Sequence, residues 1–416
     1  MSNTPQHPTN PRRKYILLTL AALTVALSAG IIGVLLTEFL HLIENLISKT
    51  QQVPHLTPIM MATAGAISGI CWWKLRQKNL PSTQDIITTR AQHYPFTRTT
   101  IDAFTQVFLV GAGASIGREA APRQLAATIA HRLYHPQHFT PEERNFLTAA
   151  ACGAALGAVY NTPYAGAAYT ISIVSPTKKW SKILAALTIS YLALLIPRAI
   201  YGAAPYYQLP TYKLEYSSWI WVIGAILIGA ILGTTFRIIS QNIIQKIRKE
   251  RPRHWWKLPA QLCSLMLLTA VIATYQPNIL GNGVLIIEQG LHHNITLSSF
   301  LILAITKPLL TLLSLRAGAA GGTLTPALAT GASIGAYIAL ASRTPEQLPV
   351  FMIIGAAALL SASEASALFG ALFTIELTHA PIELWAPLLM CSIGAEYLGK
   401  ILNRHIQHNT WLNPPH

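Results

Sequence analysis

The sequence predicts an all-α polytopic membrane protein, and its composition and apolar pattern both lead to that fold class. Hydrophobic residues make up 52% of the 416 residues and charged residues only 11%, whereas a soluble domain carries about 25% charged residues. About 20 apolar residues span a bilayer as a helix, and a transmembrane β-barrel would show alternating segments of about 10 residues instead. Long windows with almost no charge cover residues 15–37, 183–196, 219–235, 259–275, 297–315, 324–341 and 350–363.

The first apolar window follows Arg12, Arg13 and Lys14, as a signal peptide would. It is longer than the 7–15 apolar residues of a signal peptide, and no obvious small-residue cleavage site follows it. We therefore interpret 15–37 as the first membrane helix, preceded by a cytoplasmic N-terminal tail of residues 1–14.

Basic charge dominates the chain, with 30 lysine and arginine residues against 15 acids and a formal net charge of +15. In membrane proteins such residues concentrate in cytoplasmic loops. Here they concentrate in the N-terminal tail and in segments 74–78, 178–182 and 237–257, which we assign to the cytoplasmic side. We do not expect nucleic-acid binding, the other use of basic clusters, because these clusters adjoin apolar windows.

Two short stretches, far apart in the sequence, resemble one another. Residues 117–122 read GREAAP and residues 321–326 read GGTLTP, and in each a glycine precedes a proline by five positions. Likewise, GAAYTIS at 166–172 resembles GALFTIE at 370–376, with the same offset of 204 residues. Two matches at one offset predict the duplication of a unit of roughly 200 residues.

Both glycine–proline stretches have the features of an anion-binding helix start. Glycine lets the backbone turn and approach closely, proline is favoured in a first helical turn, and the free amides of that turn attract anions. In transporters with repeated halves, ion sites lie near mid-membrane on such broken helices. The alternative is that these glycines only allow close helix packing.

Glu119 is an acid flanked by apolar sequence, which is costly in a membrane and therefore a functional candidate. Its carboxylate can compete with an anion for the amides of a helix start and can leave once it is protonated. One side chain would then act as gate and proton acceptor. The alternative is an ion pair between Arg118 and Glu119 at the membrane surface.

Together, these stretches resemble the CLC family of chloride channels and proton-coupled chloride transporters. GREAAP is similar to the family's G-K/R-E-G-P motif, and GGTLTP to its G-x-F-x-P motif. The resemblance runs from about residue 20 to 403 with motif order preserved. Three further stretches carry it: YNTPYAG at 160–166 (F-N-A-P-L-A-G), GNG at 281–283 (a glycine-rich turn) and GALFTIELT at 370–378 (G-x-x-x-x-x-E-x-T).

The resemblance implies a CLC-type inverted repeat with tilted and broken helices, in halves of roughly 15–200 and 215–405, followed by a tail at 406–416. It also implies a homodimer in a bacterial-type inner membrane, with one pathway per subunit for chloride or a similar small anion. We expect no enzymatic activity, cofactor, metal site or nucleic-acid partner, and no paired nucleotide-binding modules after the last apolar window.

The family's functional residues can be placed by position in this chain. Glu119 corresponds to the gating glutamate. The outer anion site would be lined by the backbone amides of Arg118, Glu119 and Ala120, and the central site by those of Thr323 and Leu324. Thr323 and Leu324 stand where the family has an Ile-Phe pair, so the inner constriction is expected to be more polar or wider.

Two other anion ligands of the family lack a clear counterpart. A serine hydroxyl comes from its G-S-G-I-P-E motif, and the corresponding region here reads NLPSTQDI at 79–86. Ser82 is the nearest candidate, with Pro81 or Thr83 as alternatives if the register slips. A C-terminal tyrosine is also missing, and the tail offers His405, His408 or Asn409 or is simply an exposed polar segment.

The inner glutamate of the family's exchangers is absent too, because Ser172 and Ile173 occupy its region. Either the protein conducts anions passively or another group relays the proton. Glu364 in LLSASEASALFG is the candidate relay, and a buried structural acid is the alternative; Glu376 is expected to be structural. The altered filter leaves two other functions open, fluoride- or proton-coupled antiport and a non-conducting membrane protein.

Overall fold

The computed structural model describes residues 11–50, 53, 55–78, 82–88, 95–133, 138–210, 214 and 218–408. These residues are almost entirely helical, and their only strand-like pairing is an isolated antiparallel bridge between Gly117 and Gly322. The predicted all-α class is therefore confirmed. Eight described helices, namely α1, α2, α8, α9, α10, α12, α13 and α14, are long and apolar enough to cross a membrane.

The first half contains helices α1 to α8, and several of them are too short to cross a bilayer alone. Their bounds are α1 Pro11–Thr50, α2 Leu56–Arg76, α3 Thr83–Thr88, α4 Phe96–Gly111, α5 Ala120–Leu133, α6 Pro141–Tyr160, α7 Pro163–Tyr169 and α8 Trp180–Tyr201. A π-helical turn, Thr170–Val174, continues α7.

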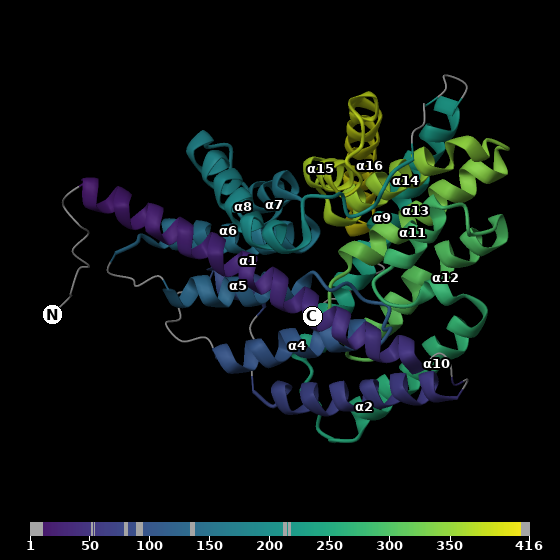
Figure 1. Cartoon of the computed structure of the whole chain (residues 1–416), viewed down its shortest axis with the longest axis horizontal. Coiled ribbons are helices and arrows are strands. Elements are labelled where there is room, and N and C mark those ends of the chain that lie inside the picture. The colour runs from purple at the N-terminus through teal and green to yellow at the C-terminus, as the bar shows by residue number, and fades with distance from the viewer. Residues whose placement is uncertain are drawn as a thin grey trace.

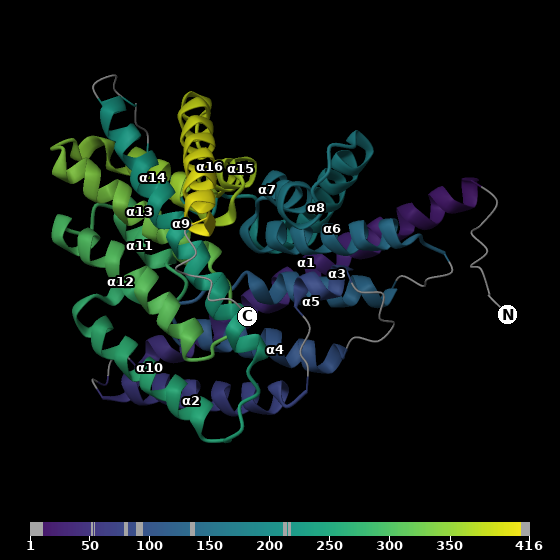
Figure 2. The ribbon, with the colours of Figure 1, turned by 180° about the vertical axis from the view of Figure 1, so that it is seen from behind.

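The second half contains α9 to α16, and its longest helices are α9 and α16. The bounds are α9 Trp219–Lys249, α10 Lys257–Tyr275, α11 Val284–Leu291, α12 Leu297–Arg316, α13 Leu324–Ala341, α14 Leu348–Glu364, α15 Ala367–Thr378 and α16 Trp385–His408. In Figures 1 and 2, α5 to α8 gather on one side and α11 to α14 on the other, while α2 of the first half lies beside α10 of the second.

Glycines bring α2 and α10 close together. A Cβ added to Gly65 would lie 2.6 Å from the carbonyl oxygen of Leu262, and one added to Gly69 would overlap with the backbone of Pro259. Lipid tails are as apolar as the side chains, so helices in a membrane associate through such close backbone packing. The packing role that we considered for the motif glycines therefore holds for these two.

The start of α6 follows from its sequence. Thr140 Oγ1 accepts a hydrogen bond from the amide of Glu143 (3.2 Å), and a Glu143 carboxylate oxygen accepts one from the amide of Thr140 (2.9 Å). This reciprocal capping box satisfies two amides that the first helical turn leaves free. At the other end, Asn161 adopts a left-handed conformation (φ 56°), which separates α6 from α7 within the YNTPYAG stretch.

Helical structure extends into the predicted tails at both ends of the chain. Helix α1 begins at Pro11 and so includes Arg12 to Lys14 of the predicted N-terminal tail. Lysine and arginine are good helix formers, so a membrane helix can continue beyond its apolar part. Helix α16 likewise continues to His408, into the predicted C-terminal tail.

Candidate functional site

The two glycine–proline stretches meet in the structure. The amide of Gly117 donates to the carbonyl of Gly322 (2.7 Å), and the amide of Gly322 donates to that of Gly117 (2.8 Å). Helix α5 begins at Ala120 and α13 at Leu324, directly after the paired residues. This pair of hydrogen bonds, the Gly117–Gly322 ladder, therefore holds the start of α5 from the first half next to the start of α13 from the second half.

Glu119 lies at this junction and is fully buried. Its Oε1 accepts a hydrogen bond from the amide of Leu324 (2.8 Å), and its Oε2 accepts one from the Thr325 hydroxyl (3.0 Å). The carboxylate thus sits on the N-terminus of α13, where the free amides and the helix dipole favour negative charge. A negatively charged ligand of α13 would have to take the same position.

Glycine on both sides of this carboxylate leaves room for it in the position observed. A Cβ added to Gly117 would overlap with both carboxylate oxygens of Glu119, and one added to Gly322 would overlap with Oε1. The backbone of the ladder therefore approaches the carboxylate more closely than any other residue would allow.

Arg118 forms no ion pair with Glu119 and turns away from it. Arg118 is 4% exposed, and its guanidinium lies over the rings of Tyr160 (5.1 Å to the centroid) and Tyr206 (5.7 Å). Nη2 donates to the Tyr206 hydroxyl at 3.0 Å. Nε and Nη1 have no hydrogen-bond partner among the described residues, so a buried positive charge lies close to the gate candidate with donors to spare.

The two residues predicted to line the central anion site, Thr323 and Leu324, differ in their contacts. Leu324 donates its amide to the Glu119 carboxylate, whereas Thr323 is the N-cap residue of α13, without a side-chain capping bond. Sequence reasoning did not single out Thr325, whose hydroxyl is the second donor to the carboxylate. A hydroxyl in the first turn after a glycine pair is the signal that would have identified it.

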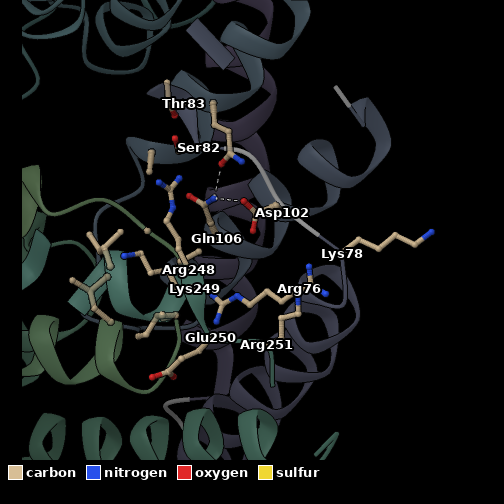
Figure 3. A pocket seen from close by; sticks show the side chains of 18 residues that line it. Arg76, Lys78, Ser82, Thr83, Asp102, Gln106, Arg248, Lys249, Glu250 and Arg251 are labelled. Carbon is tan, nitrogen blue, oxygen red and sulfur yellow. Dashed lines mark hydrogen bonds between the residues drawn. The ribbon is translucent and has the colours of Figure 1, made fainter. Parts of the chain in front are cut away.

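An inner cavity of about 420 Å³ reaches this junction (Figure 3). Its wall includes Ala120, the first residue of α5, together with Gly321 and Ser82. Ser82 Oγ accepts from the amide of Asp85 (2.9 Å), and Asp85 Oδ2 accepts from the amide of Ser82 (2.7 Å). The hydroxyl hydrogen of Ser82 remains available to donate. Thr83 also lines the cavity, while Pro81 lies outside the described residues.

The wall of the inner cavity is predominantly basic. Two acids, Asp102 and Glu250, face five cations, and a surplus of one sign of charge in a cleft concentrates ions of the opposite sign. The cations are Arg76, Lys78, Arg248, Lys249 and Arg251.

Asp102 is a buried acid in the cavity wall that sequence reasoning missed. It accepts hydrogen bonds from Trp72 Nε1 (2.7 Å) and Gln106 Nε2 (2.9 Å), and Gln106 Nε2 also reaches Gln124 on α5 (3.0 Å). Figure 3 shows Asp102 and Gln106 beside one another. The network connects α2, α4 and α5, so it fixes the helix that follows Glu119.

The proton-relay candidate Glu364 is half-buried at the end of α14. Arg123, four residues after Glu119, interacts electrostatically with both Glu119 and Glu364. Its Nε donates to the carbonyl of Glu119 (2.8 Å), and its Nη1 contacts the hydroxyl of Tyr169. Arg123 therefore interacts with both acids, and Tyr169 with Arg123 and Glu364.

The region that lacks the family's inner acid is close to Glu364. Ser172 lies in the π-helical turn after α7, and its hydroxyl is 2.8 Å from that of Ser366, two residues beyond Glu364. Such π-helical turns occur frequently at functional sites. The structure thus brings the chain's unusual acid beside the segment from which an acid is missing.

Glu376 on α15 caps another helix. Its two carboxylate oxygens accept from the amides of Tyr164 (3.0 Å) and Ala165 (2.6 Å) in the first turn of α7. These contacts agree with the structural role that we expected. Of the tail candidates, His405 is exposed near the end of α16, whereas the His408 side chain and Asn409 lie outside the described residues.

The fold and site define a polytopic helical membrane protein with a buried acid on a broken-helix N-terminus, at the contact of two halves. Comparison with known proteins gives the family. The sequence model described as "Voltage gated chloride channel" matches residues 64–400. The chain therefore belongs to the voltage-gated chloride channel (CLC) family.

Curated relatives include the H(+)/Cl(-) exchange transporter ClcA of Salmonella paratyphi A, 26% identical over 318 residues. The ClcA of Salmonella arizonae is 25% identical over the same length. In both cases the match covers 73% of this chain and 66% of the relative. The chain thus spans about two thirds of the length of these relatives.

Two solved structures share the fold. A slow cyanobacterial Cl-/H+ antiporter has a TM-score of 0.78 and 21% identity, covering 95% of this chain and 96% of that one. A CLC-type fluoride/proton antiporter has a TM-score of 0.76 and 19% identity, covering 95% and 98%. The CLC-type fold predicted from the motifs is confirmed.

Proposed function

We propose that this protein transports chloride or a similar small anion across a membrane, through a pathway gated by Glu119. One observation carries the proposal: a buried carboxylate occupies the amide of Leu324 and the hydroxyl of Thr325 at a helix N-terminus. Those donors suit a halide as well as a carboxylate. The basic inner cavity that reaches Ala120 and Gly321 supplies a route to the same place.

The gate works by competition between the Glu119 carboxylate and the anion for one binding position. This position, the seat, is formed by the Leu324 amide and the Thr325 hydroxyl. While Glu119 is ionised, its carboxylate holds the donors of Leu324 and Thr325 and excludes the anion. Protonation removes the charge that the α13 dipole attracts, so the side chain leaves and the anion binds.

The gate predicts how flux responds to pH. In liposomes, anion flux through the unmodified protein should rise as pH falls, because protonation frees the seat. Glu119→Gln should retain flux and lose its pH dependence, while Glu383→Gln, at an exposed glutamate, should behave like the unmodified protein. Equal pH dependence in Glu119→Gln and the unmodified protein would show that Glu119 is not the gate.

We further propose that anion movement is coupled to protons, with Glu364 as the relay on the inner side. The support is local: Arg123 interacts electrostatically with both Glu119 and Glu364. Ser172, in the region where the family's exchangers carry an acid, contacts Ser366, two residues after Glu364. The names of both curated relatives and both solved structures describe proton-coupled anion exchange. Fluoride remains the second candidate anion, supported by the structural likeness to a fluoride/proton antiporter.

Coupling can be measured by recording anion and proton movement together. A chloride gradient should drive protons uphill through the unmodified protein, and Glu364→Gln should lower proton movement while anion flux continues. Ser363→Ala, at the neighbouring buried position, should keep the coupling. Unchanged proton movement in Glu364→Gln would exclude this relay, and its absence in the unmodified protein would establish passive conduction. Running the same assay with fluoride decides between the two anions.

We propose that the protein acts as a homodimer in the inner membrane, with its basic segments on the cytoplasmic side. It is a transporter and not an enzyme in this proposal, and it needs no cofactor. The names of its relatives describe exchange and antiport, and the excess of lysine and arginine in 237–257 supports the orientation.

A further inference from the structure

A surface groove of about 720 Å³ lies between α10 and α12, and it shares no lining residue with the inner cavity. In Figure 1 these two helices are neighbours at one flank of the molecule. It is lined by residues of α10 and the residue before it, and by the end of α12 and the residue after it: Trp256, Lys257, Ala260, Gln261, Ser264, Leu265, Leu268, Leu313, Arg316 and Ala317.

One end of the groove is positively charged. Lys257 is the first residue of α10 and Arg316 the last of α12, and both side chains are exposed. Neither side chain forms an ion pair or a hydrogen bond with any residue that the structure describes, and the lining contains no acid. Two unneutralised cations at one end of an acid-free groove favour an anionic group there.

The rest of the groove follows one face of α10 and, apart from Gln261 and Ser264, is lined by apolar residues. Its residues recur every three or four positions from Lys257 to Leu268, a rise of about 16 Å at 1.5 Å per residue. That length matches about half of a hydrocarbon core roughly 30 Å thick. Leu268 and Leu313 are 45% and 46% exposed, so the apolar part is open to the surroundings.

The charged end also has the aromatic residues of a membrane–water boundary. Trp255 and Trp256 are 61% and 56% exposed directly before α10. Exposed tryptophans gather at the level of the lipid headgroups, where their rings meet the apolar core and their N–H groups meet water. The groove therefore begins at headgroup level and runs into one leaflet.

We propose that this groove binds an anionic phospholipid, with the phosphate on Lys257 and Arg316 and an acyl chain along Leu265, Leu268 and Leu313. A charged end followed by an apolar run of one leaflet matches the two parts of such a lipid. Basic pockets between membrane helices bind acidic headgroups in this way. A free phosphate ion would leave the apolar run unused.

Native mass spectrometry of the delipidated full-length protein tests the site with phosphatidylglycerol and phosphatidylcholine. The unmodified protein should bind phosphatidylglycerol more tightly. The double variant Lys257→Gln/Arg316→Gln should weaken that binding roughly 30-fold, since each cation near a membrane surface contributes about a fivefold factor. A matched double variant, Lys49→Gln/Arg343→Gln, removes two other exposed cations and should bind like the unmodified protein.

Four results would overturn the proposal. Equal binding of the two lipids would remove the anionic preference, and equal losses in both double variants would show that the effect is not local. Glycerol phosphate binding as tightly as the lipid would identify a phosphate site, and a changed oligomeric state in Lys257→Gln/Arg316→Gln would identify a protein partner. Thermal unfolding checks that both double variants keep their fold. Their unfolding free energy should differ little from that of the unmodified protein, because a substitution at an exposed position changes stability by less than about 0.5 kcal/mol.

Discussion

At the residue scale, the account depends on one acid and the two glycines that face it. Glu119 reaches the α13 N-terminus because Gly117 and Gly322 leave no Cβ in its way. The carboxylate gains an amide and a hydroxyl as donors, and hydrogen bonds to charged groups are roughly twice as strong as neutral ones. A buried acid without such donors would be strongly destabilising, so the seat itself makes this position tolerable.

The sequence predicts which residues surround the seat better than how their side chains lie. Glu119 and Leu324 follow from the two motifs, because glycine followed by a first helical turn determines local backbone geometry. The partners of Arg118 do not follow, because Tyr160 and Tyr206 are brought to it only by tertiary packing. Arg118 needs no ion pair with the adjacent Glu119, because two aromatic rings and a hydroxyl stabilise its buried guanidinium instead.

At the element scale, the helices that position the site are held by backbone-to-backbone packing. Helix α13 crosses α14 at Gly331, Gly335 and Gly355, where an added Cβ would overlap with the facing helix. Both helices are buried along nearly their whole length. The α13 N-terminus can therefore present Leu324 to Glu119 only while this crossing stays close.

Replacing one of these glycines should destabilise the protein. In Gly335→Ala the new Cβ would overlap with the carbonyl oxygen of Phe351, and overpacking of this kind costs about 1–3 kcal/mol. Gly224→Ala on α9, where nothing lies within 4 Å, should be neutral or slightly stabilising, because alanine favours a helix by about 1 kcal/mol over glycine. Thermal unfolding of the purified protein compares the two; a Gly335→Ala variant as stable as Gly224→Ala would contradict the packing account.

Apolar windows predict most of the long membrane helices but miss α2 and the shorter helices. Windows at 219–235 and 324–341 correspond to α9 and α13. Helices α4 and α5 were not found this way, because Arg98, Asp102 and Arg123 interrupt their apolar pattern. Those charges are satisfied inside the protein, as Asp102 is by Trp72 and Gln106, and hydropathy alone cannot register such pairing.

At the scale of the whole molecule, neither half contains a complete site. The acid and α5 come from the first half, and the α13 amide and hydroxyl come from the second, so the site requires both halves to pack together. The offset of 204 residues between matching motifs predicts a repeat, and the pairing of Gly117 with Gly322 shows the two motifs in contact. The close crossing of α2 and α10 was not predictable, because it depends on which glycine faces which backbone.

The inner cavity extends this dependence to the surroundings of the site. Its wall combines residues of α2, α4 and α5 with the end of α9 and the turn before α13. Most of these positions belong to no motif. The sequence therefore predicts that they are charged, but not that they lie together around the junction of α5 and α13. Their surplus of positive charge is a property of the assembled molecule, and it suits the negatively charged substrate that we propose.

The seat on α13 is tested most directly by locating an anion in it. Crystals of Glu119→Ala soaked in bromide should give an anomalous-scattering peak within hydrogen-bond distance of the Leu324 amide and the Thr325 hydroxyl. The unmodified protein should give no peak at that position while Glu119 is ionised. Bromide absent from that position in Glu119→Ala but bound elsewhere would contradict competition between this carboxylate and the anion.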